Sequence, residues 1–258
     1  MTAPVFVVPP TALEGVSPGA IVRVDGPEGR HAVSVRRLAV GESVDLVDGA
    51  GVRASGTVAA IVDRHSLDVR VDDTSTEPQP EPAVVVVQAL PKGDRGELAV
   101  ELLTEVGADI VVPWAAATCV TQWRPDRIER AHQRWIDAAH AAGKQSRRTR
   151  FPIVAPLAST ADVVGRLETA ALGVVLHESA ETPIADLSLP ETGEVVIVVG
   201  PEGGITDDEL GRFSAAGAHL VRLGPSVLRT SSAGMAAVAA LLAPSPRWAV
   251  RRGAGMGG

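Results

Sequence analysis

Two glycine-rich turns hold the residues of this 258-residue sequence that are best suited to chemistry. In the first, an apolar run over 195–199 leads into Gly-Pro-Glu-Gly-Gly at 200–204, and Thr206 and Glu209 then have the capping-box spacing that starts a helix. Open α/β sheets bind ligands at the carboxyl ends of their strands. Glycines there let a ligand approach backbone N–H and C=O groups, because no side chain blocks the way. The same spacing also fits a tight turn without a ligand.

The second turn follows another apolar run, over 218–223. Gly224 opens this turn, and Arg229 stands where it joins an Ala-rich helix that Ser231 and Ser232 are suited to cap. Two such turns after two parallel strands can wall one pocket. The position of Arg229 suits either a catalytic group or a surface ion pair.

Several familiar site patterns are absent from the two turns. The first turn has neither a Gly-x-Gly-x-x-Gly fingerprint nor a Gly-Lys-Ser/Thr phosphate loop, and no Gly-x-Ser-x-Gly elbow contains Ser231 or Ser232. His177-Glu178 lacks the second histidine of a zinc protease, and the other histidines show no ligand spacing. The single cysteine, Cys119, excludes a disulfide within the chain. We therefore expect no metal site and a reducing compartment.

Composition predicts a globular protein of the cytoplasm. Hydrophobic residues make up 45% and charged residues 21%, which excludes a disordered or fibrous chain. No run reaches the roughly eighteen apolar residues of a membrane span, and residues 1–10 lack the features of a signal peptide. We expect neither membrane insertion nor secretion.

Charge is distributed unevenly along the chain, whose net charge is −7. Residues 121–151 hold eight basic and three acidic residues, a local +5, whereas 157–222 hold three basic and eleven acidic residues, a local −8. Such segregation fits a surface for a polyanion beside a region that prefers cations, although it also fits solvated faces.

The elements that must position these residues fall into two parts. Short β-branched runs predict strands at 5–8, 20–24, 43–47, 56–62 and 67–71, typical of a small barrel or sandwich, so we place a first domain at 1–72. Residues 73–82 contain three prolines and no large apolar residue, which indicates a linker.

The second part, over 83–250, has the sequence pattern of an α/β domain. Its continuous apolar runs predict buried parallel strands at 83–90, 110–113, 172–177, 194–199 and 218–223. Helical periodicity predicts helices at 97–106, 126–142, 160–171, 207–216 and 231–242. Residues 251–258 have nothing to bury and are expected to form a frayed tail.

Short matches to one family run along the whole chain. The two turns contribute Gly200-Pro201-Glu202-Gly203-Gly204 and Leu223-Gly224-x-x-Val227-Leu228-Arg229-Thr230. Further matches are Val35-Arg36-Arg37 with Gly41-Glu42, Lys92-Gly93-Asp94-Arg95, Thr104-Glu105-Val106-Gly107, and Gln145-Ser146-x-Arg148 with Pro152. In this order and spacing, the sequence resembles the ribosomal RNA small subunit methyltransferase E family of the SPOUT superfamily.

The resemblance implies a fold that periodicity does not reveal. It implies a PUA-like β-barrel that helps to hold RNA, followed by a SPOUT-type α/β domain with a mostly parallel sheet, helices on both faces and a deep trefoil knot. It also implies a homodimer.

The implied activity is methylation of N3 of a specific uridine in 16S ribosomal RNA of the small subunit, with S-adenosylmethionine as cofactor. Arg229 is the implied catalytic residue, because a fixed guanidinium stabilises the negative charge that a uracil carbonyl gains when N3 loses its proton. The implied cofactor-binding residues are Leu176, His177, Val199, Gly200, Pro201, Glu202, Gly203, Gly204, Leu223, Gly224, Val227 and Leu228. The implied RNA-binding residues are Arg30, Arg36, Arg37, Lys92, Arg147, Arg148 and Arg150.

The sequence departs from the family pattern at a few positions. Ser231 stands where the family usually has a glutamate, Arg30-His31 replaces a paired histidine, and an arginine is missing from 117–120. The missing acid favours an alternative function, a non-catalytic RNA-binding or ribosome-assembly factor. An enzyme that binds nucleotide phosphates at the first turn is a third possibility, although the usual lysine is absent.

Overall fold

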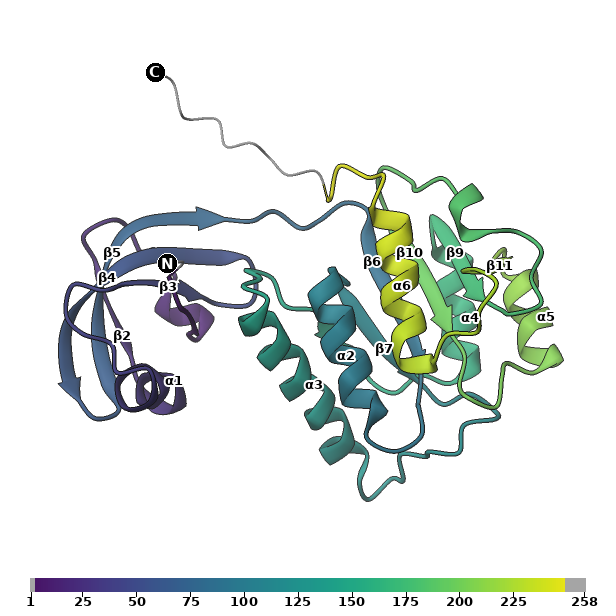
Figure 1. Cartoon of the computed structure of the whole chain (residues 1–258), viewed down its shortest axis with the longest axis horizontal. Coiled ribbons are helices and arrows are strands. Elements are labelled where there is room, and N and C mark those ends of the chain that lie inside the picture. The colour runs from purple at the N-terminus through teal and green to yellow at the C-terminus, as the bar shows by residue number, and fades with distance from the viewer. Residues whose placement is uncertain (1–2, 249–258) are drawn as a thin grey trace. The chain divides into compact units, whose positions relative to one another are not determined.

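The computed structural model describes residues 3–248, and these form two compact units. One unit comprises residues 3–79 and 139–151, and the other comprises residues 80–138 and 152–248. Figure 1 labels most of the helices and strands. The tail expected at 251–258 lies outside the described residues.

The first unit is built on a five-stranded sheet in the order β1-β3-β4-β5-β2, in which only β1 and β3 run parallel. Its apolar side chains, including Phe6, Leu46 and Val69, form one buried core. Register shifts in β4 bend the sheet around that core. The elements are β1 (Val5–Val7), η1 (Pro10–Ala12), β2 (Ile21–Val24), α1 (Gly26–Arg30), η2 (His31–Val35), β3 (Ser43–Val47), β4 (Val52–Asp63) and β5 (Ser66–Thr76).

The predicted linker, 73–82, begins too early. Strand β5 continues to Thr76, which pairs with Val52 of β4, so residues 73–76 belong to the first unit's sheet. The polar residues of this stretch, such as Asp73, suit an exposed strand end because the partner strand satisfies the backbone. The lack of large apolar residues in 73–76 therefore does not end the strand.

The predicted domain 83–250 also needs correction, because residues 139–151 belong to the first unit. Phe151 packs with Val5 and Val47, and the Lys144 ammonium pairs with Glu28 at 2.6 Å. A Cβ on Gly143 would lie 2.4 Å from the Phe151 ring, so glycine is needed for this packing. These contacts join positions far apart in the sequence, which a local pattern does not encode.

The second unit confirms the expected α/β fold with a parallel sheet. Its six strands lie in the order β11-β9-β10-β6-β7-β8, and every neighbouring pair is parallel. The central strands, β6 and β10, are apolar and buried along most of their length, as a sheet covered on both faces requires. The strands are β6 (Ala83–Ala89), β7 (Ile110–Trp114), β8 (Ile153–Val154), β9 (Leu172–Leu176), β10 (Glu194–Val199) and β11 (His219–Val221).

The helices begin and end at local signals in the sequence. Ser159 and Asp162 form a capping box at the start of α4, and Thr206 and Glu209 form another at the start of α5. Gly107 ends α2 in the left-handed conformation, with φ of 104°. Helices α2 and α6 pack on each other, and α6 lies against β6 and β10 (Figure 1). The helices are α2 (Arg95–Val106), α3 (Ile128–Gln145), which enters the first unit at residue 139, α4 (Thr160–Thr169), η3 (Ile184–Asp186), α5 (Asp207–Ala215) and α6 (Thr230–Leu242).

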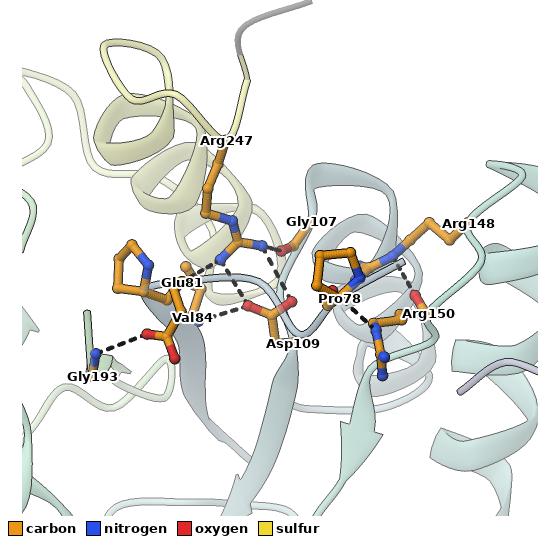
Figure 2. Close-up of polar contacts among 10 residues, drawn as sticks. Pro78, Glu81, Val84, Gly107, Asp109, Arg148, Arg150, Gly193 and Arg247 are labelled. Carbon is orange, nitrogen blue, oxygen red and sulfur yellow. Dashed lines mark hydrogen bonds and ion pairs between the residues drawn. The ribbon is translucent and has the colours of Figure 1, made fainter. Parts of the chain in front are cut away.

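An ion pair fixes the edge of this sheet where the strands begin. The Arg247 guanidinium donates to both carboxylate oxygens of Asp109, at 2.8 and 3.2 Å, and also to the carbonyl oxygens of Pro82 and Gly107 (Figure 2). Both charged side chains are largely buried, 13% and 11% exposed. This network therefore joins the loops before β6 and β7 to the segment after α6.

Candidate cofactor site

A cavity of about 220 Å³ lies where strands β9, β10 and β11 end. Because these strands are parallel, the loops that follow them meet at one edge of the sheet. Its walls are 176–178 after β9, residues of 199–205 after β10, and 221–228 after β11, and Thr230 and Ala233 of α6 close it. The two glycine-rich turns therefore wall one cavity, as their sequence pattern predicts.

Most of the residues assigned to the cofactor line this cavity. They are Leu176, His177, Val199, Gly200, Pro201, Gly204, Leu223, Gly224, Val227 and Leu228. Sequence reasoning missed other lining residues, namely Glu178, Ile205, Val221, Arg222, Thr230 and Ala233. The available signal was the position of Val221 and Arg222 at the end of β11 and of Thr230 and Ala233 at the start of α6.

The backbone N–H and C=O groups of the second turn are available to a ligand. Residues 223–228 make no backbone hydrogen bond to another residue of the described chain. A Cβ on Gly224 would meet no protein atom within 4 Å, so open space adjoins this glycine. N–H and C=O groups without protein partners, next to open space, are what a ligand with polar edges needs. The cavity therefore fits a small molecule held by the backbone.

Two of the assigned residues, Glu202 and Gly203, do not line the cavity. The Glu202 carboxylate accepts hydrogen bonds from the backbone N–H of Lys92, at 3.2 and 3.3 Å. A Cβ on Gly203 would lie 2.9 Å from the Cβ of Thr118. Both residues therefore face the loops that follow β6 and β7, and glycine at 203 makes room for Thr118.

His177 lines the cavity with its ring held by the local backbone. Its Nδ1 accepts a hydrogen bond from the N–H of Ser179 at 3.3 Å. The backbone N–H of His177 donates to Val221 of the neighbouring strand. The two walls after β9 and β11 are thus joined at this residue.

Glu209 connects the first turn to two other segments. It is 3% exposed, and its carboxylate accepts hydrogen bonds from the N–H of Ala117, the hydroxyl of Thr160, and the N–H and hydroxyl of Thr206. Burial raises the pKa of this carboxyl, but the hydrogen bonds outweigh burial and leave its pKa below the ordinary value. Sequence reasoning found only the capping box and missed the longer-range bonds.

Arg229 stands between the second turn and α6. It is the N-cap residue of α6, its side chain is exposed, and it does not line the cavity itself, although Leu228 and Thr230 on either side do. It makes no ion pair with another residue in 3–248. The surface ion pair considered for Arg229 is thus not formed there.

The assigned RNA-binding arginines all lie in the first unit, and they differ in their contacts. Arg30, Arg36 and Arg37 are exposed in or just after the α1–η2 segment and make no ion pair with another described residue. The Arg150 guanidinium instead donates to the carbonyl oxygens of Glu77 and Pro78. Figure 2 shows the bond to Pro78 and the bond from Nε of Arg148 to the carbonyl of Arg150.

The other assigned basic residues are exposed. The Arg147 carbonyl accepts from Arg53 within the first unit, while its own side chain faces solvent. Lys92, in the second unit, has an exposed side chain beside Glu202.

No three His, Cys, Asp or Glu side chains in residues 3–248 are gathered closely enough to hold a metal ion. Within the same residues, no helix has both the length and the apolar content needed to cross a membrane.

Comparison with known proteins assigns the chain to a family. Residues 77–242 match the model of the RNA methyltransferase domain, and residues 24–72 match that of the RNA methyltransferase PUA domain. The chain is 45% identical over 234 residues to ribosomal RNA small subunit methyltransferase E of Mycobacterium bovis, covering 89% of each chain. It is 30% identical over 227 residues to the Bacillus subtilis protein of the same name, covering 84% of this chain and 88% of that one.

A solved structure agrees with the sequence comparisons. Ribosomal RNA small subunit methyltransferase E from Neisseria gonorrhoeae, crystallised with S-adenosylmethionine, superposes with a TM-score of 0.81 at 25% identity, covering 94% of this chain and 98% of that chain. Because the cavity, the two domain matches and the relatives along nearly the whole chain agree, this protein belongs to the ribosomal RNA small subunit methyltransferase E family of RNA methyltransferases.

Proposed function

We propose that this protein transfers a methyl group from S-adenosylmethionine to N3 of a uridine in 16S ribosomal RNA of the small subunit. The observation that carries the proposal is the cavity at the ends of β9, β10 and β11, where the backbone of 223–228 has no backbone hydrogen-bond partner in the described chain. The names of the relatives and the cofactor of the Neisseria gonorrhoeae structure support the choice of donor and of RNA.

The cofactor supplies an electrophilic methyl group, and the turns after β10 and β11 hold it. Val199–Gly200, Gly204 and 223–228 offer backbone groups, and the side chains of Leu176, Val227 and Leu228 offer apolar contact. Glu202 positions the loop after β6 through Lys92 rather than contacting the cofactor.

Arg229 acts on the methyl acceptor. Uracil N3 carries a proton at neutral pH and must lose it when the methyl group is added. This loss places negative charge on the uracil oxygens. A guanidinium is a planar set of donors that stays charged at working pH, so it stabilises this charge but does not take the proton. The exposed position of Arg229 at the rim of the cavity, without an ion-pair partner among the described residues, supports this role.

RNA is held by basic side chains of both units. We assign phosphate contacts to Arg30, Arg36, Arg37, Arg147 and Lys92, whose side chains are exposed. Arg148 and Arg150 instead hold the backbone next to Arg147 in place, because their guanidinium groups donate to backbone carbonyls. The substrate is 16S ribosomal RNA in the cytoplasm, within the small subunit.

The active form is a homodimer with a knotted second unit. Exposed apolar side chains on α2 and the second turn, Leu98, Val227 and Leu228, support a subunit contact. The trefoil knot is proposed from the sequence resemblance to the SPOUT superfamily.

Two measurements on the full chain test this function. Calorimetry with S-adenosylmethionine should show binding, and mass mapping of 16S ribosomal RNA after reaction should place one added methyl group on a uridine base. No heat with the cofactor, together with retained RNA binding, would instead favour the non-catalytic factor suggested by Ser231.

A further inference from the structure

A second cavity, of about 420 Å³, lies in the same unit where β6 and β7 end. Its walls are Leu90, Pro91 and Gly93 after β6, the start of α2, and residues 121–124 with the first turns of α3. It shares no lining residue with the cofactor cavity, and the family assignment gives it no role.

Two tryptophans give this cavity an aromatic wall. The ring centroids of Trp123 and Trp135 lie 5.3 Å apart, and the rings meet edge to face at 88°. Trp135 is 4% exposed, and a Cβ on Gly96 would lie 2.7 Å from its Nε1. The indole of Trp135 therefore packs directly against α2 at Gly96. Trp123 is only partly buried and is therefore the ring that a ligand can reach.

The rim of the cavity is basic. Arg124, Arg127 and Arg134 line it, and Arg130 lines the adjoining hollow with Arg127 and Arg134. Glu97 and Asp126 pair with Arg134 and Arg127, at 3.4 and 3.5 Å, through exposed contacts of little strength. Arg124 and Arg130 make no ion pair with another described residue, so the rim keeps two uncompensated positive charges.

Hydrogen bonds connect this cavity to the cofactor-binding turn. The Lys92 N–H donates to Glu202, and the Thr121 hydroxyl donates to the Pro91 carbonyl at 2.8 Å. The Thr118 hydroxyl donates to the Gly204 carbonyl at 2.5 Å. The loops that form the second cavity are therefore attached to the turn that borders the first.

A partly exposed aromatic ring beside unpaired arginines suits single-stranded nucleic acid, because a base stacks on the ring while guanidinium groups contact phosphates. We propose that this cavity binds one nucleotide of a single-stranded RNA segment, with its base on Trp123 and its phosphates at Arg124 and Arg130. The proposal rests on the proposed function, since it describes how the RNA substrate is held beside the methyl donor. An acidic protein segment would contact the same arginines but would not stack a base on Trp123.

The test uses two labelled probes of about ten nucleotides, an oligouridine and an abasic oligonucleotide of the same length. Trp123→Ala should weaken oligouridine binding roughly five- to 150-fold and leave the abasic probe unaffected. Trp123→Phe should retain the affinity. Arg124→Ala should weaken both probes and reduce the salt dependence of binding by about 0.7 in log–log slope. Matched controls are Trp248→Ala and Arg212→Ala, exposed residues of the same unit that lie outside the cavity.

The proposal would be overturned if Arg124→Ala bound both probes with the parental affinity and the parental salt dependence. Because the Arg124 side chain is exposed, this variant is expected to fold. An equal loss for both probes in Trp123→Ala would overturn the stacked base. Cofactor affinity is measured in parallel by calorimetry. A parental chain that binds no S-adenosylmethionine would refute the proposed function, whereas parental methylation with unaffected variants would refute only the nucleotide site.

Discussion

The hydroxyl of Thr118 donates a hydrogen bond to the carbonyl of Gly204 at 2.5 Å, and it joins the loop after β7 to the turn after β10. The neighbouring Gly203 leaves room for Thr118, since a Cβ there would lie 2.9 Å from the Thr118 Cβ. The glycines of this turn thus have two separate uses. Gly200 and Gly204 border the cavity, whereas Gly203 admits the neighbouring loop.

The first prediction separates these uses at Gly203 and Gly224. Gly224→Val should weaken S-adenosylmethionine binding about tenfold or more with little change in melting temperature, because its side chain enters open space at the cavity. Gly203→Val should lose about 1–3 kcal/mol of stability because it displaces Thr118, and it should weaken binding only indirectly, through the hydrogen bond from Thr118 to Gly204. Calorimetry and thermal unfolding measure both quantities. Parental affinity in Gly224→Val would remove the second turn from the cofactor site.

The second prediction concerns Arg229. Arg229→Lys keeps the charge but loses the planar set of donors, so the single-turnover rate should fall on the order of a hundredfold to a thousandfold, about 3–4 kcal/mol. Cofactor affinity should stay near the parental value, because Arg229 does not line the cavity. Arg212→Lys, also exposed in the same unit, is the control. A parental rate in Arg229→Lys would show that the residue does not serve the chemical step.

The third prediction contrasts two arginines of the first unit. Arg36→Ala should weaken RNA binding and reduce the salt slope by roughly 0.7–0.9, with parental stability, because its side chain is exposed and forms no ion pair in the described chain. Arg150→Ala should leave the salt slope unchanged and cost about 1 kcal/mol or more of stability, because it loses its bonds to the Glu77 and Pro78 carbonyls. Binding titrations over a range of salt concentrations and thermal unfolding check the contrast, which is refuted if the two variants behave alike.

The fourth prediction is a pH dependence of stability due to Glu209. Its pKa is lower in the folded chain than in the unfolded chain, so its contribution is complete above the ordinary glutamate pKa of about 4.3 and is lost as pH falls through the folded value. Glu209→Gln should therefore be less stable by about 1–3 kcal/mol at neutral pH and should lose less stability on acidification. Denaturant unfolding from neutral to acidic pH measures this, with the exposed Glu168→Gln as control. Parallel pH profiles for Glu209→Gln and the parent would contradict the prediction.

Much of the architecture could be predicted because the signals are local. The apolar runs at 83–90 and 194–199 indicated central parallel strands, and the structure has β6 and β10 there. The Thr206–Glu209 spacing predicted the start of α5, and the glycines after two strands predicted the cavity between their loops. Periodicity, capping and glycine turns each depend on residues a few positions apart, so the sequence displays them directly.

The sequence by itself determined the fold class, the strand-end turns and many of the residues that line the cavity where β9, β10 and β11 end. Only the tertiary structure decided that 139–151 joins the first unit through Phe151 and Lys144, that Glu202 faces Lys92, and that Trp123 and Arg124 share a second cavity. The physical reason is that these relationships depend on close packing between segments distant in the chain. Which side chains meet there is set by strand order and by the space that neighbouring residues leave.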